Sequence, residues 1–424
     1  MFSPDKRVAT LDKPEVFILV SGFAILLITI FIFNRPAFYD EDDYLRNVAI
    51  IHKFGFGKEY LLNLIGSAGP LYSTVHYLLE PVTHLAFPFT RLVNIAFLAG
   101  VTILIGLSLK LLKFSERKNG LIIMAIPMTY VISGLALTEM PAMFFLSSGI
   151  YLVIKSVTEK STYFRSLFNA LLAGICMSLA ILGRQPYLLL LAALPILFPG
   201  KKNSLRNSSI LIVTLLSSLA LPCYIFWIWK GLVAPSDAAF YADIAGQGIN
   251  YRPELLLLCL AYYAIVFILI APEFYKVPTR KEMFILLTSA VMISVLNQKI
   301  DLIRFLPLKA IYIKILSSQH IDFAEKFAGS LLAVTGIYFM IIVFRRLRDT
   351  GFKKELLFYA VALLAIAISC IKLTHGFSSR YAAQAIPLLI PFSVYFNKNN
   401  PYSYLRLSIG VLTGSLSLVM YFIS

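Results

Sequence analysis

The stretch VFILVSGFAILLITIFIFNRPAFYDEDDYLRN, residues 16–47, joins a long apolar run to four consecutive carboxylates. Residues 16–33 are long enough to cross a bilayer as a helix, in which the backbone amides are hydrogen-bonded within the segment itself. Residues 34–36, Asn-Arg-Pro, follow in place of a small-residue cleavage site, so the run predicts a transmembrane helix and not a cleaved signal peptide. The acidic run, residues 40–43, is therefore expected at one surface of the membrane.

The rest of the chain repeats this apolar character. Of its 424 residues 59% are hydrophobic and only 14% are charged, and the mean hydropathy is +0.80, far from the composition of soluble domains. We expect one integral membrane domain over residues 1–424, all-α and polytopic, with no appended soluble domain. About thirteen apolar runs suit transmembrane helices. They are expected near residues 16–33, 92–112, 121–137, 141–155, 167–182, 186–199, 209–229, 254–271, 283–297, 327–344, 355–371, 381–396 and 405–423.

The net charge of +16 has a topological explanation. Lys and Arg form short clusters in alternate connections between the apolar runs, as the positive-inside rule describes for cytosolic loops, and not the patch of a nucleic-acid-binding protein. This pattern predicts a cytosolic N-terminus. The long connections 34–91, 230–253 and 298–326 then face the periplasm, the cell exterior or the lumen of the endoplasmic reticulum. The four cysteines lie in or beside apolar runs without CxxC spacing, which is typical of core residues.

Three ionisable residues lie where helices meet that same outer side. Glu139 is in the turn LALTEMPAMFF, Arg184 is in the turn ILGRQPYLLLL, and Arg380 precedes an apolar run in THGFSSRYAAQAIPLL. A charge at the membrane edge is costly unless it is paired or hydrated, so these residues are candidates for function. The alternative is that each is a solvated turn residue that ends a helix.

The outer connections also contain segments suited to the membrane surface. The stretch LIGSAGPLYSTVHYLLEPVTHLAFPFTRLVNIAF, residues 64–97, has a helical period. Leu71, Val75, Leu78 and Leu79 lie on one side and His76, Glu80 and Thr83 lie off that stripe, which predicts an interfacial amphipathic helix. The connection 298–326 interleaves basic and apolar residues, which suits contact with anionic headgroups. Its basic residues are Lys299, Arg304, Lys309 and Lys314.

Taken in order, several motifs resemble those of GT-C glycosyltransferases that use a polyprenyl-phosphate sugar. YDEDDYLRNVA resembles the Asp-Glu-x-x-Tyr motif after the first span, and AGPLYSTVHYLL is similar to the Pro-Pro-Leu-Tyr stretch that precedes an Arg-Leu pair, here Arg91 and Leu92. LTEMPAMFF and RYAAQAIPLL look like the family's later acidic turn and its Arg-Tyr helix entrance. The set also has a partial likeness to the lumenal α-1,2-glucosyltransferase of N-glycan precursor assembly.

The resemblance implies a GT-C-like helical bundle and inverting transfer of a sugar from a polyprenyl-phosphate donor to an acceptor hydroxyl. The acceptor would be a lipid-linked glycan or another hydroxyl compound, and the reaction would take place on the outer side of a bacterial, archaeal or endoplasmic reticulum membrane. Such a displacement needs a carboxylate base and cations that hold the leaving phosphate. The resemblance implies Asp40 as the base, with Glu41 as the second choice, and no metal or cofactor. The substrate-binding residues it implies are Tyr44, Arg91, Glu139, Arg184, Gln185, Arg380 and Tyr381.

Two other classes of membrane protein remain as alternatives. A flippase or transporter for a lipid-linked glycan would carry charges within its spans and broken helices. A polysaccharide polymerase or ligase would use a pyrophosphate-linked glycan and an Arg-rich late outer loop.

Overall fold

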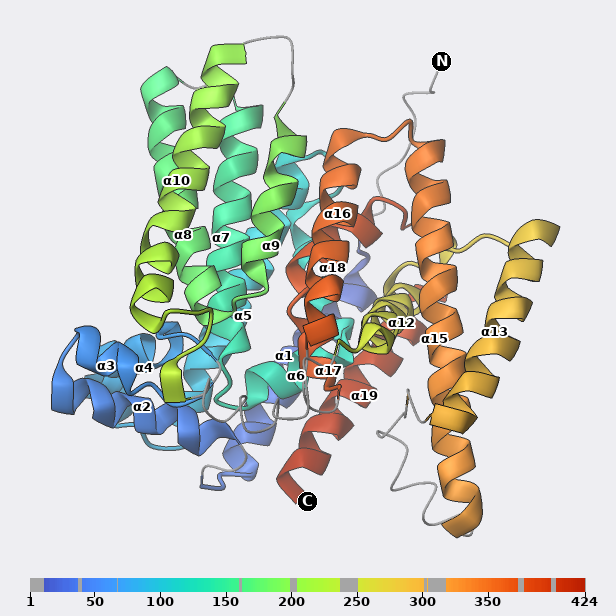
Figure 1. Cartoon of the computed structure of the whole chain (residues 1–424), viewed down its shortest axis with the longest axis horizontal. Coiled ribbons are helices and arrows are strands. Elements are labelled where there is room, and N and C mark those ends of the chain that lie inside the picture. The colour runs from blue at the N-terminus through green and yellow to red at the C-terminus, as the bar shows by residue number, and fades with distance from the viewer. Residues whose placement is uncertain are drawn as a thin grey trace.

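The computed structural model describes residues 11–36, 40–66, 68–159, 162–198, 204–236, 251–300, 303, 318–372, 377–397 and 402–423. Within these ranges the chain is built from helices and contains no strand (Figure 1). The expected all-α membrane fold is confirmed.

Nine helices in the described ranges are long and apolar enough to cross a membrane. Each coincides with a predicted apolar run. They are α1 (Lys13–Ile32), α5 (Phe89–Leu111), α7 (Glu139–Thr158), α8 (Tyr163–Gly183), α10 (Ser204–Trp229), α12 (Pro253–Ile270), α15 (Ser318–Asp349), α16 (Lys354–Ser369) with the 3-10 turn η5 (Cys370–Lys372), and α19 (Ser403–Ile423).

The other four predicted spans differ from long apolar helices, so the count of thirteen is not confirmed. One is the helix α13 (Arg280–Ile300), which packs on α15 at the edge of the molecule. The remaining three are broken. They consist of η1 (Arg117–Ala125) with α6 (Pro127–Gly134), α9 (Tyr187–Leu190) with η2 (Leu191–Leu197), and α17 (Ser379–Ala383) with α18 (Ile386–Val394).

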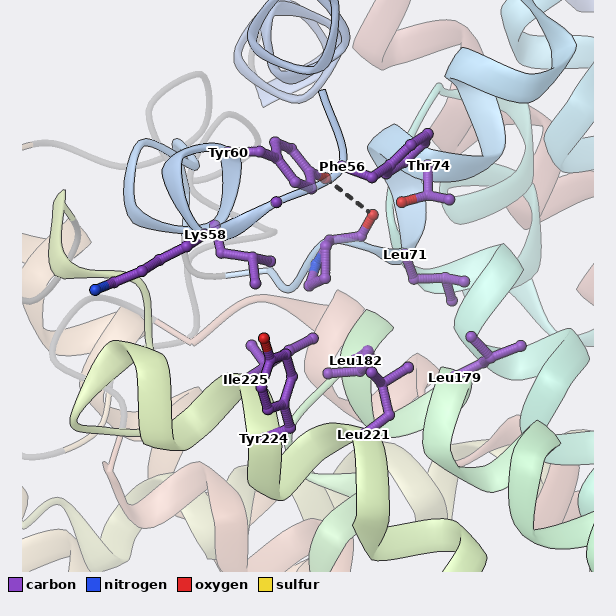
Figure 2. A pocket seen from close by; sticks show the side chains of 13 residues that line it. Phe56, Lys58, Tyr60, Leu71, Thr74, Leu179, Leu182, Leu221, Tyr224 and Ile225 are labelled. Carbon is purple, nitrogen blue, oxygen red and sulfur yellow. Dashed lines mark hydrogen bonds between the residues drawn. The ribbon is translucent and has the colours of Figure 1, made fainter. Parts of the chain in front are cut away.

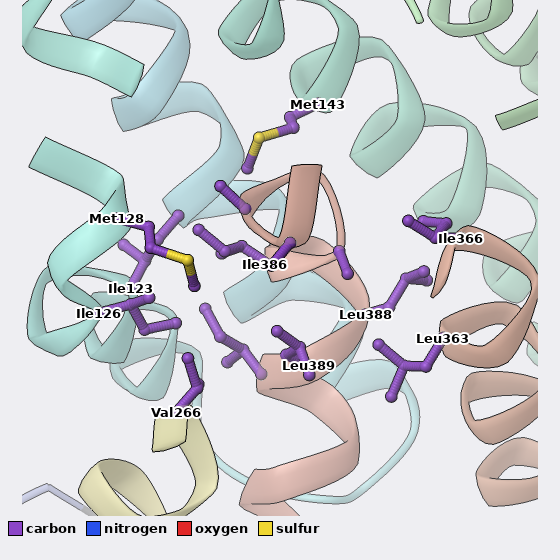
Figure 3. Packing of buried hydrophobic residues seen from close by; sticks show 14 of the residues in the cluster. Ile123, Ile126, Met128, Met143, Val266, Leu363, Ile366, Ile386, Leu388 and Leu389 are labelled. Atoms are coloured by element: carbon purple, nitrogen blue, oxygen red, sulfur yellow. The ribbon is translucent and has the colours of Figure 1, made fainter. Parts of the chain in front are cut away.

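Proline accounts for these breaks, and burial allows them. Pro127 and Pro387 lie in the first turns of α6 and α18, and Pro195 lies inside η2. A proline removes a backbone donor and obstructs the preceding turn. Irregular backbone survives at membrane depth only where protein covers it. All nine residues of α18 are buried, and Figure 3 shows its side chains Ile386, Leu388 and Leu389 surrounded by those of other helices.

Three short helices lie across one end of the bundle, at the bottom of Figure 1: α2 (Asp40–Phe54), α3 (Lys58–Leu62) and α4 (Leu71–Thr83). The predicted amphipathic helix is α4, but its faces are used in an unexpected way. Leu78 is 65% exposed, whereas His76 is completely buried. The predicted apolar stripe is therefore divided: Leu78 faces outward, Val75 and Leu79 are half-buried, and Leu71 is buried against the protein together with the polar His76.

Candidate active site

The acidic run divides into three different environments. It forms the first turn of α2, where carboxylates are favoured by the helix dipole. Asp42 and Asp43 are about half exposed and pair with Arg46 on the same helix. Asp40 and Glu41 point elsewhere, each to an arginine from a distant part of the chain. The four carboxylates of the acidic run therefore differ in both exposure and partner.

Glu41 is sealed inside the protein by Arg91. The Arg91 Nε donates to Glu41 Oε1 at 3.0 Å and its Nη2 donates to Oε2 at 2.8 Å, and both side chains are 0% exposed. Arg91 also donates to the backbone carbonyl of Arg35 at 3.1 Å and packs over the rings of Phe87 and Phe422. This bidentate pair fixes the start of α2 against α5.

The same carboxylate holds the loop between α6 and α7. Glu41 Oε1 accepts the Ala136 backbone N–H at 2.6 Å, and the Tyr72 hydroxyl donates to the Ala136 carbonyl at 2.7 Å. Asn94 Nδ2 donates to the carbonyls of Leu135 and Leu137 at 2.7 and 2.8 Å. We call residues 135–138 the clamped loop. It ends at Glu139, so these bonds determine where that carboxylate lies.

The sequence motifs assigned no role to Asn94. They included Tyr72 but did not predict what it does. A signal for Asn94 exists in its spacing. It lies three residues after Arg91, on the same side of an otherwise apolar helix, and a polar residue at such a position needs a partner.

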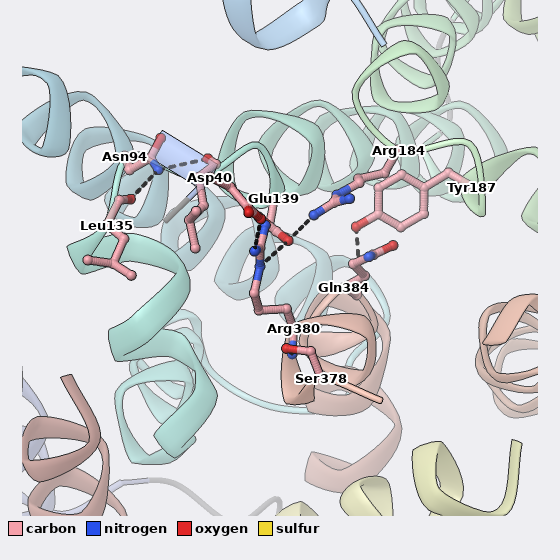
Figure 4. Close-up of polar contacts among 10 residues, drawn as sticks. Asp40, Asn94, Leu135, Glu139, Arg184, Tyr187, Ser378, Arg380 and Gln384 are labelled. Atoms are coloured by element: carbon pink, nitrogen blue, oxygen red, sulfur yellow. Dashed lines mark hydrogen bonds and ion pairs between the residues drawn. The ribbon is translucent and has the colours of Figure 1, made fainter. Parts of the chain in front are cut away.

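Four ionisable side chains from four segments meet at one end of the bundle (Figure 4). Arg380 donates from Nη1 to Asp40 Oδ2 at 2.6 Å and from Nε to Glu139 Oε1 at 2.9 Å. Arg184 pairs with the same Glu139 oxygen. We call Asp40, Arg380, Glu139 and Arg184 the charge cluster. It brings together four of the predicted site residues.

Burial is graded along the charge cluster. The side chain of Asp40 is 50% exposed, that of Arg380 18%, that of Arg184 9% and that of Glu139 0%. Asp40 therefore lies at the mouth and Glu139 at the base. The two carboxylates balance the charges of the two guanidinium groups, which makes the burial of the arginines tolerable.

A close backbone contact positions the turn that carries Arg184. Arg184 follows Gly183 at the end of α8, where an added Cβ would come within 2.7 Å of the Ala142 side chain. Tyr187, three residues later, donates its hydroxyl to the Gln384 carbonyl at 2.9 Å. This bond ties the turn that carries Arg184 to the segment that carries Arg380.

The tyrosines of the predicted site border the charge cluster. Tyr44 and Asp40 both hydrogen-bond the side chain of Arg380. Burial lowers the pKa of Arg184, which also interacts electrostatically with Tyr44 and Tyr381. Gln185 is half-buried next to Arg184. Tyr44 and Tyr381 therefore lie near the charge cluster.

An apolar groove of about 280 Å³ lies between the short helices α3 and α4 and the adjacent ends of α8 and α10 (Figure 2). Its wall includes Leu71 and Leu182, which lies two residues before Arg184, and Lys58 and Tyr224 also line it.

In the described ranges no three His, Cys, Asp or Glu side chains gather as metal ligands would. The predicted basic residues Arg304, Lys309 and Lys314 lie outside those ranges.

The family model of dolichyl-phosphate-mannose-protein mannosyltransferases matches residues 58–233. This segment includes Arg91, Glu139 and Arg184. Over this segment, which is less than half of its length, the chain is similar to that glycosyltransferase family. No curated protein sequence matches it.

Distant similarity to solved structures extends over most of the chain. ArnT from Cupriavidus metallidurans bound to undecaprenyl phosphate has 12% identity and a TM-score of 0.43, over 95% of this chain and 77% of that one. The same enzyme in the apo state has 12% identity and a TM-score of 0.41, over 94% and 76%. The Archaeoglobus fulgidus oligosaccharyltransferase tethered to an acceptor peptide has 11% identity and a TM-score of 0.32, over 91% and 56%.

Proposed function

We propose that this protein is a glycosyltransferase that moves a sugar from a polyprenyl-phosphate donor to an acceptor hydroxyl, with inversion, on the periplasmic, exterior or lumenal side of its membrane. The observation that carries the proposal is the charge cluster. It presents a half-exposed carboxylate, Asp40, directly beside a guanidinium that can hold an anion. A base and an anion site side by side are what a displacement with a phosphate leaving group requires.

Asp40 is the proposed general base, because an acceptor can reach it. Glu41 is fully enclosed and accepts hydrogen bonds from Arg91 and Ala136, so we assign it a positioning role. Arg91 is committed to Glu41 and to backbone carbonyls, and we assign it the same role.

Arg380 and Arg184 are the proposed phosphate ligands. Both arginines pair with the same oxygen of Glu139. An arriving phosphate would compete with Glu139 for the two guanidinium groups and neutralise part of their positive charge. Tyr44, Gln185 and Tyr381 would line the sugar and the phosphate. The apolar groove would receive the polyprenyl chain, since most of its lining is apolar and one lining residue, Leu182, lies two residues before Arg184. The proposal calls for no metal or other cofactor. The acceptor would be a lipid-linked glycan or another hydroxyl compound.

Asp40→Asn tests the base assignment. The amide keeps the size of the side chain but cannot take a proton, so transfer from a polyprenyl-phosphate sugar should fall at least about 100-fold. Asp43→Asn is the matched control, because Asp43 is similarly exposed and pairs only on the surface with Arg46. The measurement is radiolabelled sugar transfer by purified protein. A well-folded Asp40→Asn variant with near-normal transfer would refute the assignment.

A further inference from the structure

At the base of the charge cluster, several buried polar atoms lack a hydrogen-bond partner among the described residues. Three are oxygens: Thr138 Oγ1, Glu139 Oε2 and Gln384 Oε1. The fourth is the nitrogen Arg184 Nε. Thr138 and Gln384 are each 1% exposed and Glu139 is 0% exposed. Leaving such groups unpaired costs about 1–3 kcal/mol each, so their clustering indicates that something supplies the missing bonds.

The chain path brings these residues together. Thr138 precedes Glu139 at the start of α7, and its hydroxyl caps no backbone N–H of the helix. Gln384 follows Arg380 by four residues and ends α17 as its C-cap, in the turn that leads to α18. The bond from Tyr187 to the Gln384 carbonyl holds that residue next to the turn of Arg184 (Figure 4).

The chemistry of the unpaired atoms selects the ligand. A carboxylate oxygen and an amide oxygen only accept hydrogen bonds, and a phosphodiester has no O–H to give them. A sugar hydroxyl both donates and accepts, so it can satisfy Glu139 Oε2 or Gln384 Oε1 and also take a hydrogen bond from Arg184 Nε.

We propose that Thr138, Glu139 and Gln384 form a subsite that hydrogen-bonds the hydroxyl groups of the donor sugar, with Gln384 as a specificity-determining residue. This inference rests on the proposed function. Arg380 covers Glu139 from the exposed side in the unliganded protein. The donor phosphate draws the Arg380 guanidinium toward itself, and the sugar then reaches Glu139 Oε2, the oxygen that neither arginine contacts.

The test compares two ligands that differ only in the sugar. Binding of undecaprenyl phosphate and of undecaprenyl-phosphate mannose or glucose is measured on the purified full-length protein in detergent. Gln384→Leu should weaken binding of the preferred sugar-bearing lipid roughly 10-fold, the worth of one buried hydrogen bond, and change binding of bare undecaprenyl phosphate less than about twofold. Thr138→Val should have the same selective effect.

Tyr187→Phe is the control for structural damage. It removes the bond to the Gln384 backbone but leaves the Gln384 side chain intact, so any effect should weaken both lipids equally. If Gln384→Leu unfolds the protein, Gln384→Met replaces it, because Met has a similar length and no acceptor of comparable strength.

Monodeoxy analogues of the preferred sugar identify the hydroxyl that Gln384 contacts. Removing that hydroxyl should weaken binding by wild type about as much as Gln384→Leu does, and the two changes together should cost no more than either alone.

Each other outcome decides against a specific claim. If the Gln384 and Thr138 variants affect both lipids equally, or neither, the subsite is refuted, since buried water then suffices for these atoms, while the proposed function survives. If wild type binds neither bare undecaprenyl phosphate nor its glycosylated forms, the proposed function itself fails.

Discussion

At the scale of single residues, adjacent carboxylates have opposite environments. Asp40 is half exposed, and Glu41, the next residue, is completely enclosed. Successive helical residues point about 100° apart, so one faces the mouth of the charge cluster while the other enters the core. A chemical distinction between two similar side chains thus follows from their direction.

The Glu41–Arg91 pair should be destabilising when only one partner is removed. Glu41→Gln leaves a buried guanidinium without its counter-ion, which costs about 3–5 kcal/mol and should lower the Tm measured in detergent. The double variant Glu41→Leu with Arg91→Leu should recover much of that loss, because no isolated charge remains. A Glu41→Gln protein that has wild-type Tm but no transfer activity would instead indicate that Glu41 is the base.

His76 gives a prediction for pH. Burial lowers the pKa of His76 to about 4, and its ring packs on Tyr72 with centroids 4.3 Å apart. An unfolded chain binds this proton below about pH 6.5 and the folded one only near pH 4, so the histidine subtracts stability as pH falls from 6.5 to 4.

The measurement for His76 is Tm in detergent as a function of pH. His76→Phe should flatten the decline between pH 6.5 and 4, and His84→Phe, at an exposed position, is the control. An unchanged profile in His76→Phe would show that His76 is protonated equally in both states.

At the scale of elements, the clamped loop connects structural residues to functional ones. Asn94, Tyr72 and Glu41 come from α5, α4 and α2, and all bond to residues 135–137. The loop leads directly into Glu139 at the start of α7. Three helices that carry neither Arg184 nor Arg380 therefore set the position of the carboxylate that pairs with both arginines.

Asn94→Leu tests whether the position of Glu139 depends on the clamped loop. It leaves the carbonyls of Leu135 and Leu137 unpaired in a buried site, at about 1–3 kcal/mol each, and lets Glu139 shift. We expect sugar transfer to fall about 10-fold or more, with kcat affected more than KM. Thr102→Val, which removes a hydroxyl bonded within α5 itself, should leave transfer unchanged. Equal activity of the two variants would contradict the role of the loop.

At the scale of the whole molecule, the long helices and the broken helices differ in how deeply they are buried. The nine long apolar helices include those with large exposed side chains, such as Trp227 of α10 at 77%. The broken segments α6 and α18 are buried almost throughout. Protein neighbours cover their irregular backbone, and one of these segments, α17 with α18, carries Arg380 to the charge cluster.

The sequence by itself determined the class of the molecule and most of its candidate site. Runs of about 20 apolar residues have few stable alternatives to membrane helices, and the motifs around Asp40, Glu139, Arg184 and Arg380 are local. The tertiary structure decided which groups meet. Glu41 pairs with Arg91 fifty positions away, and Asp40 with Arg380 at a separation of 340. Such pairings depend on how helices pack, and no local pattern of residues encodes whether a carboxylate is open to an acceptor or sealed by an arginine.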